Sequence, residues 1–250
     1  MAKPFEVVVE QVVEATPEET WEAVSTGLGM DGWFMGSSTV EPRLGGVVRT
    51  ALPGLTMEST ITTWDPPHRF ANTSAEDADG RLMAFEFTIE GRAGGTTHLR
   101  LVHSGFLPDE IWADEFDALK KGDPTYVFKL AEYLKYFRGR QAVPVSVYGP
   151  PVPAAEAWPA FNAVMGVAPD VEVGAPVRFT PTGLPEIDGV IDYRSSDLLG
   201  VRTADAMYRF FVGMGIAYVG HHIFADVDPA ATQAAWEAWL NGLFAEAGVA

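Results

Sequence analysis

Apolar and polar residues alternate along residues 81–106, and this pattern is the strongest in the chain. The alternation predicts two β-strands that each bury one face. Between them, Gly91, Gly94 and Gly95 supply a turn that tolerates positive φ. The stretch therefore predicts a long β-hairpin with one apolar, aromatic face that something else must cover. The residues of that face are Met83, Phe85, Phe87, Ile89, Leu99, Leu101 and His103.

The same alternation predicts further strands at residues 5–14, 39–52, 56–64 and 69–75. Helix signals lie between and after them. Thr16, Pro17 and Glu19 form a helix start, with Thr16 as the N-cap, and Gly27 and Gly29 are expected to end that helix. A short second helix is expected at residues 31–35.

Two helices are expected after the hairpin. An amphipathic helix is predicted within an insertion at residues 107–122, and Asp123-Pro124 is expected to start a second helix that ends near residue 137. A strand, two helices, a series of antiparallel strands and a long last helix make an α+β layout. The last helix is predicted to lie against a curved sheet and to cover its apolar face.

The second part of the chain resembles a shortened copy of the first. Residues 187–203 follow residues 57–73 without gaps, Asp228-Pro229 repeats Asp123-Pro124, and His221 stands where His103 does. The copy has no counterpart of residues 107–122. We therefore expect a first domain at residues 1–140, a linker with an edge strand at 141–152, and a reduced second domain at 153–250.

Composition narrows the classes of function. The formal net charge of −17 disfavours nucleic acid and anionic membranes as partners, because phosphates would be repelled. The absence of cysteine excludes disulfides and thiolate metal sites. No apolar run approaches the length of about 20 residues that a membrane span needs, and no signal peptide is evident, so a cytoplasmic location is expected.

Several motifs occur in an order that resembles a known superfamily. They are Trp21, Gly32-Trp33-Phe34, Gly45-Gly46, Asp65-Pro66-Pro67-His68-Arg69-Phe70, Gly95-Thr96 and His103-Ser104-Gly105-Phe106. The sequence is similar to the SRPBCC (START-like, helix-grip) superfamily, in the branch named after the activator of the ninety-kilodalton heat-shock chaperone ATPase. The resemblance implies a curved antiparallel sheet that grips a long C-terminal helix, often with an apolar cavity between them.

Members of that superfamily include lipid and hormone carriers, polyketide cyclases and chaperone-binding proteins, so the fold alone does not fix the function. We first expect a binding protein for a small hydrophobic or aromatic molecule. The alternatives are a cyclase-like or aromatase-like enzyme that uses His103, and a protein-interaction module. The expected ligand-binding residues are Trp33, Met57, Phe85, Phe87, Leu101, His103, Trp112, Tyr126 and Leu130.

His103 is the main candidate for chemistry, because a histidine at the end of an inward-facing strand can orient or deprotonate a ligand near neutral pH. The alternative is a core histidine bonded to backbone or to Ser104. His221 and His222 are adjacent, so they face opposite sides of a strand and cannot chelate one metal ion. We therefore expect no metal site and no cofactor.

Overall fold

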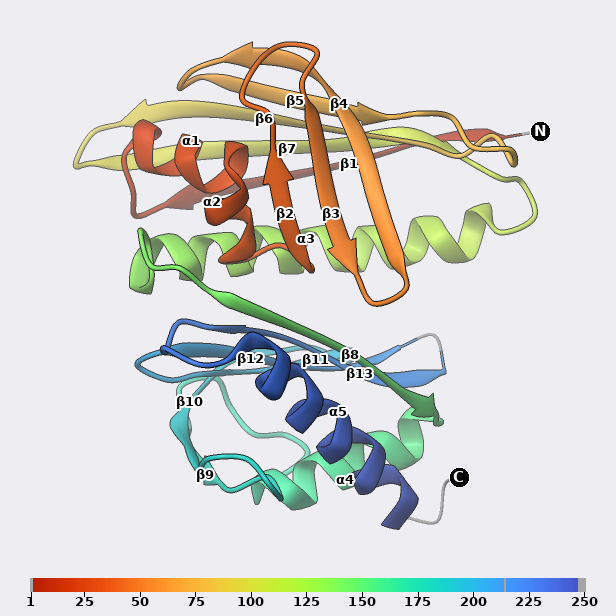
Figure 1. Cartoon of the computed structure of the whole chain (residues 1–250), viewed down its shortest axis with the longest axis vertical. Helices are drawn as coiled ribbons and strands as arrows, with labels where there is room; N and C mark the ends of the chain where they lie inside the picture. Colours follow the sequence, from red (N-terminus) through yellow and green to blue (C-terminus); the bar gives the residue numbers. More distant parts are fainter. Residues whose placement is uncertain (1, 214, 247–250) are drawn as a thin grey trace. The chain divides into compact units, whose positions relative to one another are not determined.

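The computed structural model describes residues 2–213 and 215–246. The chain folds into two compact units, residues 1–141 and 142–250, each built on an antiparallel sheet with helices against it (Figure 1). This is the predicted α+β class with two copies of one fold.

The N-terminal unit contains a seven-stranded sheet in the order β1-β7-β6-β5-β4-β3-β2. The predicted hairpin is its centre, since β6 and β7 pair in register from Leu82–Phe106 to Arg92–Thr96. The strands are β1 Lys3–Val13, β2 Ser37–Val40, β3 Val47–Leu52, β4 Leu55–Asp65, β5 Arg69–Ser74, β6 Leu82–Arg92 and β7 Thr96–Leu107.

Helix α1 (Pro17–Ser25) begins as its sequence predicts. The Thr16 side chain accepts a hydrogen bond from the Glu19 backbone, and the Glu19 carboxylate accepts one from the Thr16 backbone. The second helix differs from the prediction, because α2 spans Gly27–Asp31 rather than residues 31–35. A Cβ on Gly29 would lie 2.2 Å from the Glu22 carbonyl oxygen. Gly29 thus allows the close packing of α2 on α1, and Gly27 allows a close approach to Ser38, rather than ending a helix.

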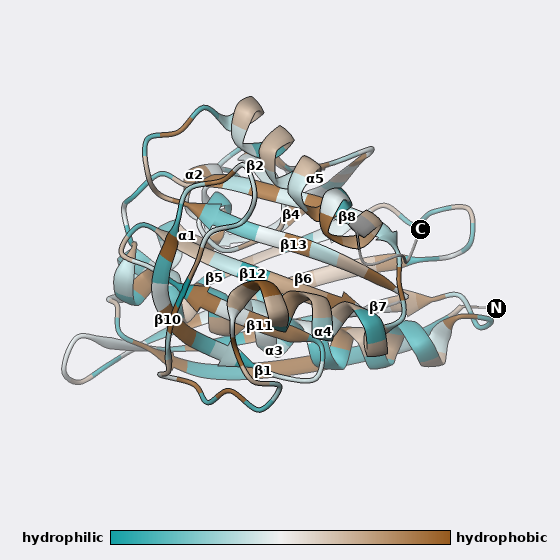
Figure 2. Ribbon diagram, turned by 90° about the horizontal axis from the view of Figure 1, so that it is seen from below, coloured by the Kyte–Doolittle hydropathy of each residue, from teal (hydrophilic) through white to brown (hydrophobic). Residues whose placement is uncertain are grey.

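Helix α3 corrects another expectation, because it runs unbroken over Trp112–Tyr136 with Pro124 inside it. Proline removes one backbone donor but does not stop a helix whose flanking turns are held by other contacts. The turns around Pro124 are held here, because Asp123 bonds to His103 and Val127 is buried. Hydrophilic and hydrophobic residues alternate along α3 (Figure 2). Its apolar side packs against β1 and β7 with Val127, Leu130 and Leu134 buried.

The C-terminal unit has a six-stranded sheet in the order β8-β13-β12-β11-β10-β9. Its first strand, β8, occupies most of the stretch expected to be a linker, so residues 143–151 belong to this sheet as its edge. Helices α4 (Ala154–Met165) and α5 (Pro229–Glu246) pack on it. The strands are β8 Val143–Pro151, β9 Pro176–Phe179, β10 Ile187–Arg194, β11 Leu198–Arg202, β12 Ala206–Gly213 and β13 Ile216–Ile223.

The two sheets share their strand order, except that the second has no counterpart of β2 among the residues that the structure describes. They also share an irregularity. The register shifts between Ile61 and Thr63 where β4 pairs with β5, and between Ile191 and Tyr193 where β10 pairs with β11. This matches the predicted equivalence of Ile61 and Ile191. In both copies that isoleucine exchanges backbone hydrogen bonds with a two-residue segment, residues 45–46 or 174–175.

Candidate functional site

A buried histidine–carboxylate pair lies between β7 and α3. His103 Nδ1 is 3.0 Å from Asp123 Oδ2 and 3.2 Å from Oδ1. The two residues are 3% and 6% exposed. Strand β7 turns His103 inward because it alternates with Val102 and Ser104, and α3 brings Asp123 to it. The histidine is therefore bonded to a side chain rather than to backbone or Ser104.

Aromatic rings surround the imidazole. Phe85, its partner across the β6–β7 pair, stacks on it with centroids 4.0 Å apart, and the Phe5 ring meets it edge-on at 5.2 Å. Phe34 bridges from Phe85 to Tyr126, at 6.4 and 5.4 Å between centroids. The pair thus sits in a low-dielectric setting, where a hydrogen bond is stronger and an unmet one is costlier than in water.

His103 Nε2 is buried and makes no hydrogen bond within the part of the chain that the structure describes. A buried polar atom without a hydrogen bond lowers the stability of the folded state by about 1–3 kcal/mol. Such atoms are uncommon in native proteins, and a binding or catalytic role is one explanation for them. His103 Nε2 is therefore the atom of this site that a ligand could hydrogen-bond.

The inward face of the sheet changes along its length. Phe87, Leu101, Leu130 and Trp33 are buried and form a closed core. Phe34, Phe85 and Tyr126 are only partly buried. Since Phe85 projects from the same face as Phe87, the cover over this face is incomplete beside His103.

Polar pairs line the same face on the neighbouring strands. The hydroxyls of Ser38 and Thr50 are 3.0 Å apart, and the Ser59 hydroxyl donates to Asn72 Oδ1 at 2.7 Å. Register places Asn72 opposite Phe85, so polar groups continue sideways from the histidine. These four residues form two hydrogen-bonded pairs, whereas His103 keeps Nε2 without a hydrogen bond.

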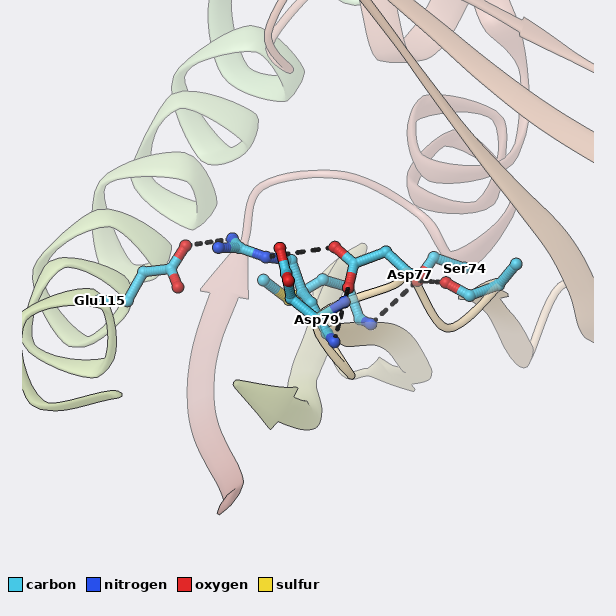
Figure 3. A network of polar contacts seen from close by, with 7 residues as sticks. Ser74, Asp77, Asp79 and Glu115 are labelled. Atoms are coloured by element: carbon cyan, nitrogen blue, oxygen red, sulfur yellow. Dashed lines mark hydrogen bonds and ion pairs between the residues drawn. The ribbon is translucent and has the colours of Figure 1, made fainter. Parts of the chain in front are cut away.

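A surface network holds the start of α3 close to the sheet (Figure 3). The Asp77 carboxylate accepts from the backbone N–H groups of Asp79 and Arg81, at 2.9 Å each, and so orders the loop before β6. The Arg81 guanidinium then pairs with Glu115 of α3. Together with the bond from Trp112 to Pro4, it fixes the helix end that precedes Asp123.

The predicted site residues fall into three groups. Phe85, His103 and Tyr126 lie at the partly accessible end, while Trp33, Phe87, Leu101 and Leu130 are core. Met57 is 36% exposed on β4, and Trp112 packs on Phe116 at the start of α3. The sequence analysis missed Asp123 as a partner of His103, because an aspartate before a proline is also a normal helix start.

The second copy has the same histidine in different surroundings. Register between β12 and β13 puts Tyr208 opposite His221, as Phe85 is opposite His103. His221 Nδ1 accepts from the Arg209 backbone N–H at 2.9 Å, and Trp236 of α5 lies 4.1 Å from its ring. The His221 ring therefore packs against an indole, and its Nδ1 accepts from backbone. His221 does not repeat the arrangement around His103.

A separate groove of about 320 Å³ lies between α1, α2 and the end of α3. It contains none of the predicted site residues and is lined by Glu19, Glu22, Ala23, Thr26, Leu28, Gly29, Tyr133, Arg138 and Gly139. Within residues 2–213 and 215–246, no three metal-binding side chains gather, and no helix combines the length and apolarity that crossing a bilayer requires.

Residues 14–135 match the model of the family described as "Activator of Hsp90 ATPase homolog 1-like protein". The N-terminal unit is therefore similar to this family over most of its length. The resemblance predicted from Trp21, from the Gly32-Trp33-Phe34 motif and from the segment at residues 103–106 is confirmed. Comparison with curated proteins gave no match.

Solved structures similar to this chain match either about half of it or nearly all of it. Protein MLL2253 from Mesorhizobium loti is 25% identical, and the match covers 53% of this chain and 98% of that one, with a TM-score of 0.47. The Aha1 dimer from Colwellia psychrerythraea is 16% identical over 54% and 99%, with a TM-score of 0.47. The di-domain ARO/CYC BexL of the BE-7585A biosynthetic pathway is 13% identical over 98% and 96%, with a TM-score of 0.48.

Proposed function

We propose that the N-terminal unit binds a small aromatic molecule that packs on Phe85 and hydrogen-bonds to His103. The observation that carries this proposal is the unused, buried His103 Nε2 beside a partly exposed aromatic side chain. Ligand sites of this kind combine apolar area with a few fixed polar groups.

In this proposal the ring of Phe85 turns aside to admit the ligand, since it covers one face of the imidazole and is itself partly accessible. Tyr126 and Phe34 flank the ligand. The buried residues Trp33, Phe87, Leu101 and Leu130 form the floor, and Met57 and Trp112 stand at the rim.

The test is calorimetric titration and thermal unfolding of the full chain with a series of small aromatic compounds. A ligand that binds only the folded state raises the melting temperature in proportion to its occupancy. Phe85→Ala should change the affinity at least several-fold. Phe106→Ala is the matched control, because Phe106 lies on the same hairpin but is exposed. A series that never raises the melting temperature would count against binding.

The His103–Asp123 pair also favours a second candidate, a cyclase-like enzyme. A carboxylate that orients an imidazole is a recurrent arrangement for acid–base catalysis, and His103 would take a proton from a carbon next to a carbonyl and return it. Acetonaphthone in deuterated water provides a probe, since such exchange replaces its methyl hydrogens with deuterium. His103→Ala should abolish catalysed exchange while leaving the ligand bound. If the wild type exchanges these hydrogens only at the uncatalysed rate, the enzyme candidate is wrong and the binding function stands.

A further inference from the structure

The carboxylate of Asp123 determines which hydrogen-bonding group a ligand must present to His103. An ionised carboxylate only accepts hydrogen bonds, so Nδ1, which is 3.0 Å away, carries the hydrogen. In a neutral imidazole the other nitrogen then has a lone pair and no hydrogen. His103 Nε2 is therefore an acceptor.

The surroundings keep this assignment fixed. His103 and Asp123 are both buried, and the aromatic rings of Phe5 and Phe85 offer the imidazole no competing hydrogen-bond partner. Rotation of the ring about its χ2 bond would move Nδ1 away from the carboxylate and leave it unpaired in an apolar environment. The site thus holds one tautomer in one orientation.

We infer that the N-terminal unit selects aromatic molecules that carry a hydrogen-bond donor, such as a phenolic hydroxyl, and discriminates against analogues with only an acceptor. The inference rests on the proposed function and adds its ligand class. Asp123 is the positioning residue, because it acts on the ligand through His103.

Three naphthalenes substituted at one ring position separate the possibilities: naphthol donates and accepts, methoxynaphthalene only accepts, and methylnaphthalene does neither. While His103 is neutral, the wild type should bind naphthol about tenfold more tightly than the other two compounds, as expected for one buried hydrogen bond. Methoxynaphthalene should gain nothing over methylnaphthalene.

Two variants test the origin of the preference. His103→Phe should bind all three compounds alike, because an apolar ring replaces the acceptor. Asp123→Asn should bring the ratio of naphthol affinity to methoxynaphthalene affinity towards one. An amide can present either its oxygen or its NH₂ group to Nδ1 and so allows both tautomers. A change that only disturbed packing would weaken all three compounds together and leave their ratios unchanged.

The relative affinities of the wild type for the three compounds test the donor preference without any variant. Equal binding of the three compounds would overturn the donor preference while leaving the proposed binding function intact. Binding of none of them would overturn both. Tighter binding of methoxynaphthalene would show that Nε2 carries the hydrogen and would reverse the assignment.

Discussion

His103 and His221 occupy equivalent positions in the two copies but use Nδ1 in opposite ways. His103 Nδ1 faces the Asp123 carboxylate, to which we infer that it donates, whereas His221 Nδ1 accepts from the Arg209 backbone N–H. A repeated sequence position has thus acquired two different electrostatic environments.

This difference predicts opposite neutral tautomers, with the hydrogen on Nδ1 in His103 and on Nε2 in His221. Two-bond proton–nitrogen correlation spectra of the full chain, labelled with nitrogen-15 in histidine, distinguish the two forms directly. His103→Phe and His221→Phe assign the signals. The same tautomer in His103 and His221 would contradict these hydrogen bonds.

Asp31 predicts a pH-dependent contribution to stability. Burial raises its pKa to about 6, although the Ser38 backbone and the Ser37 hydroxyl donate to it. An acid whose pKa is raised on folding stabilises the fold at low pH, and this contribution is lost as the pH rises from about 4 through about 6. Asp31→Asn should therefore gain stability relative to the wild type over this range.

Denaturant unfolding of the wild type and of Asp31→Asn between about pH 4 and about pH 6 measures the difference in their free energies of unfolding. The contributions of the other carboxylates cancel in this difference. Asp65→Asn is the control, because Asp65 is exposed. A constant difference between wild type and Asp31→Asn across the range would show that the pKa is not raised.

The C-terminal unit contains a buried ion pair that predicts a non-additive result. Arg209 donates twice to Asp192, at 3.0 and 2.7 Å, and both residues are buried. Removing one partner leaves a buried charge uncompensated, so Arg209→Met should cost about 3–5 kcal/mol. The double variant Arg209→Met with Asp192→Leu should recover much of that loss in denaturant unfolding. An additive double variant would mean that the pair is not coupled.

Gly200 is part of the same arrangement. A Cβ at this position would lie 2.4 Å from Asp192 Oδ1 and 2.9 Å from Arg209 Nη1. The glycine on the intervening strand β11 therefore leaves the space that the two charged side chains occupy.

The Arg81 network predicts local rather than global stabilisation. Arg81 and Glu115 are partly exposed, so their pair contributes at most about 1 kcal/mol. Arg81→Met should increase hydrogen exchange in the first turns of α3 and in the loop before β6, with little change in melting temperature. Arg92→Met, at the exposed hairpin end, should leave exchange in α3 unchanged. Equal exchange in all three proteins would show that the network does not hold the helix.

The sequence predicted those features that arise from local pattern. Period-two alternation located β6 and β7, the Thr16 cap located α1, and the same alternation placed His103 on the inward face. Pro124 misled the prediction of α3, because the contacts that hold the helix before and beside it come from Arg81 and His103, which lie outside the helix. The partnership of His103 with Asp123 depends on how α3 lies against β7, and no periodicity carries that information.

The loss of a strand from the second sheet has a consequence for self-association. Within the described part of the chain, β9 is then an edge strand that pairs with β10 alone. Exposed edges recruit other chains into fibrils, but β9 is four residues long and opens with Pro176, which has no N–H to offer an incoming strand. The edge at β9 is therefore a poor template for polymerisation.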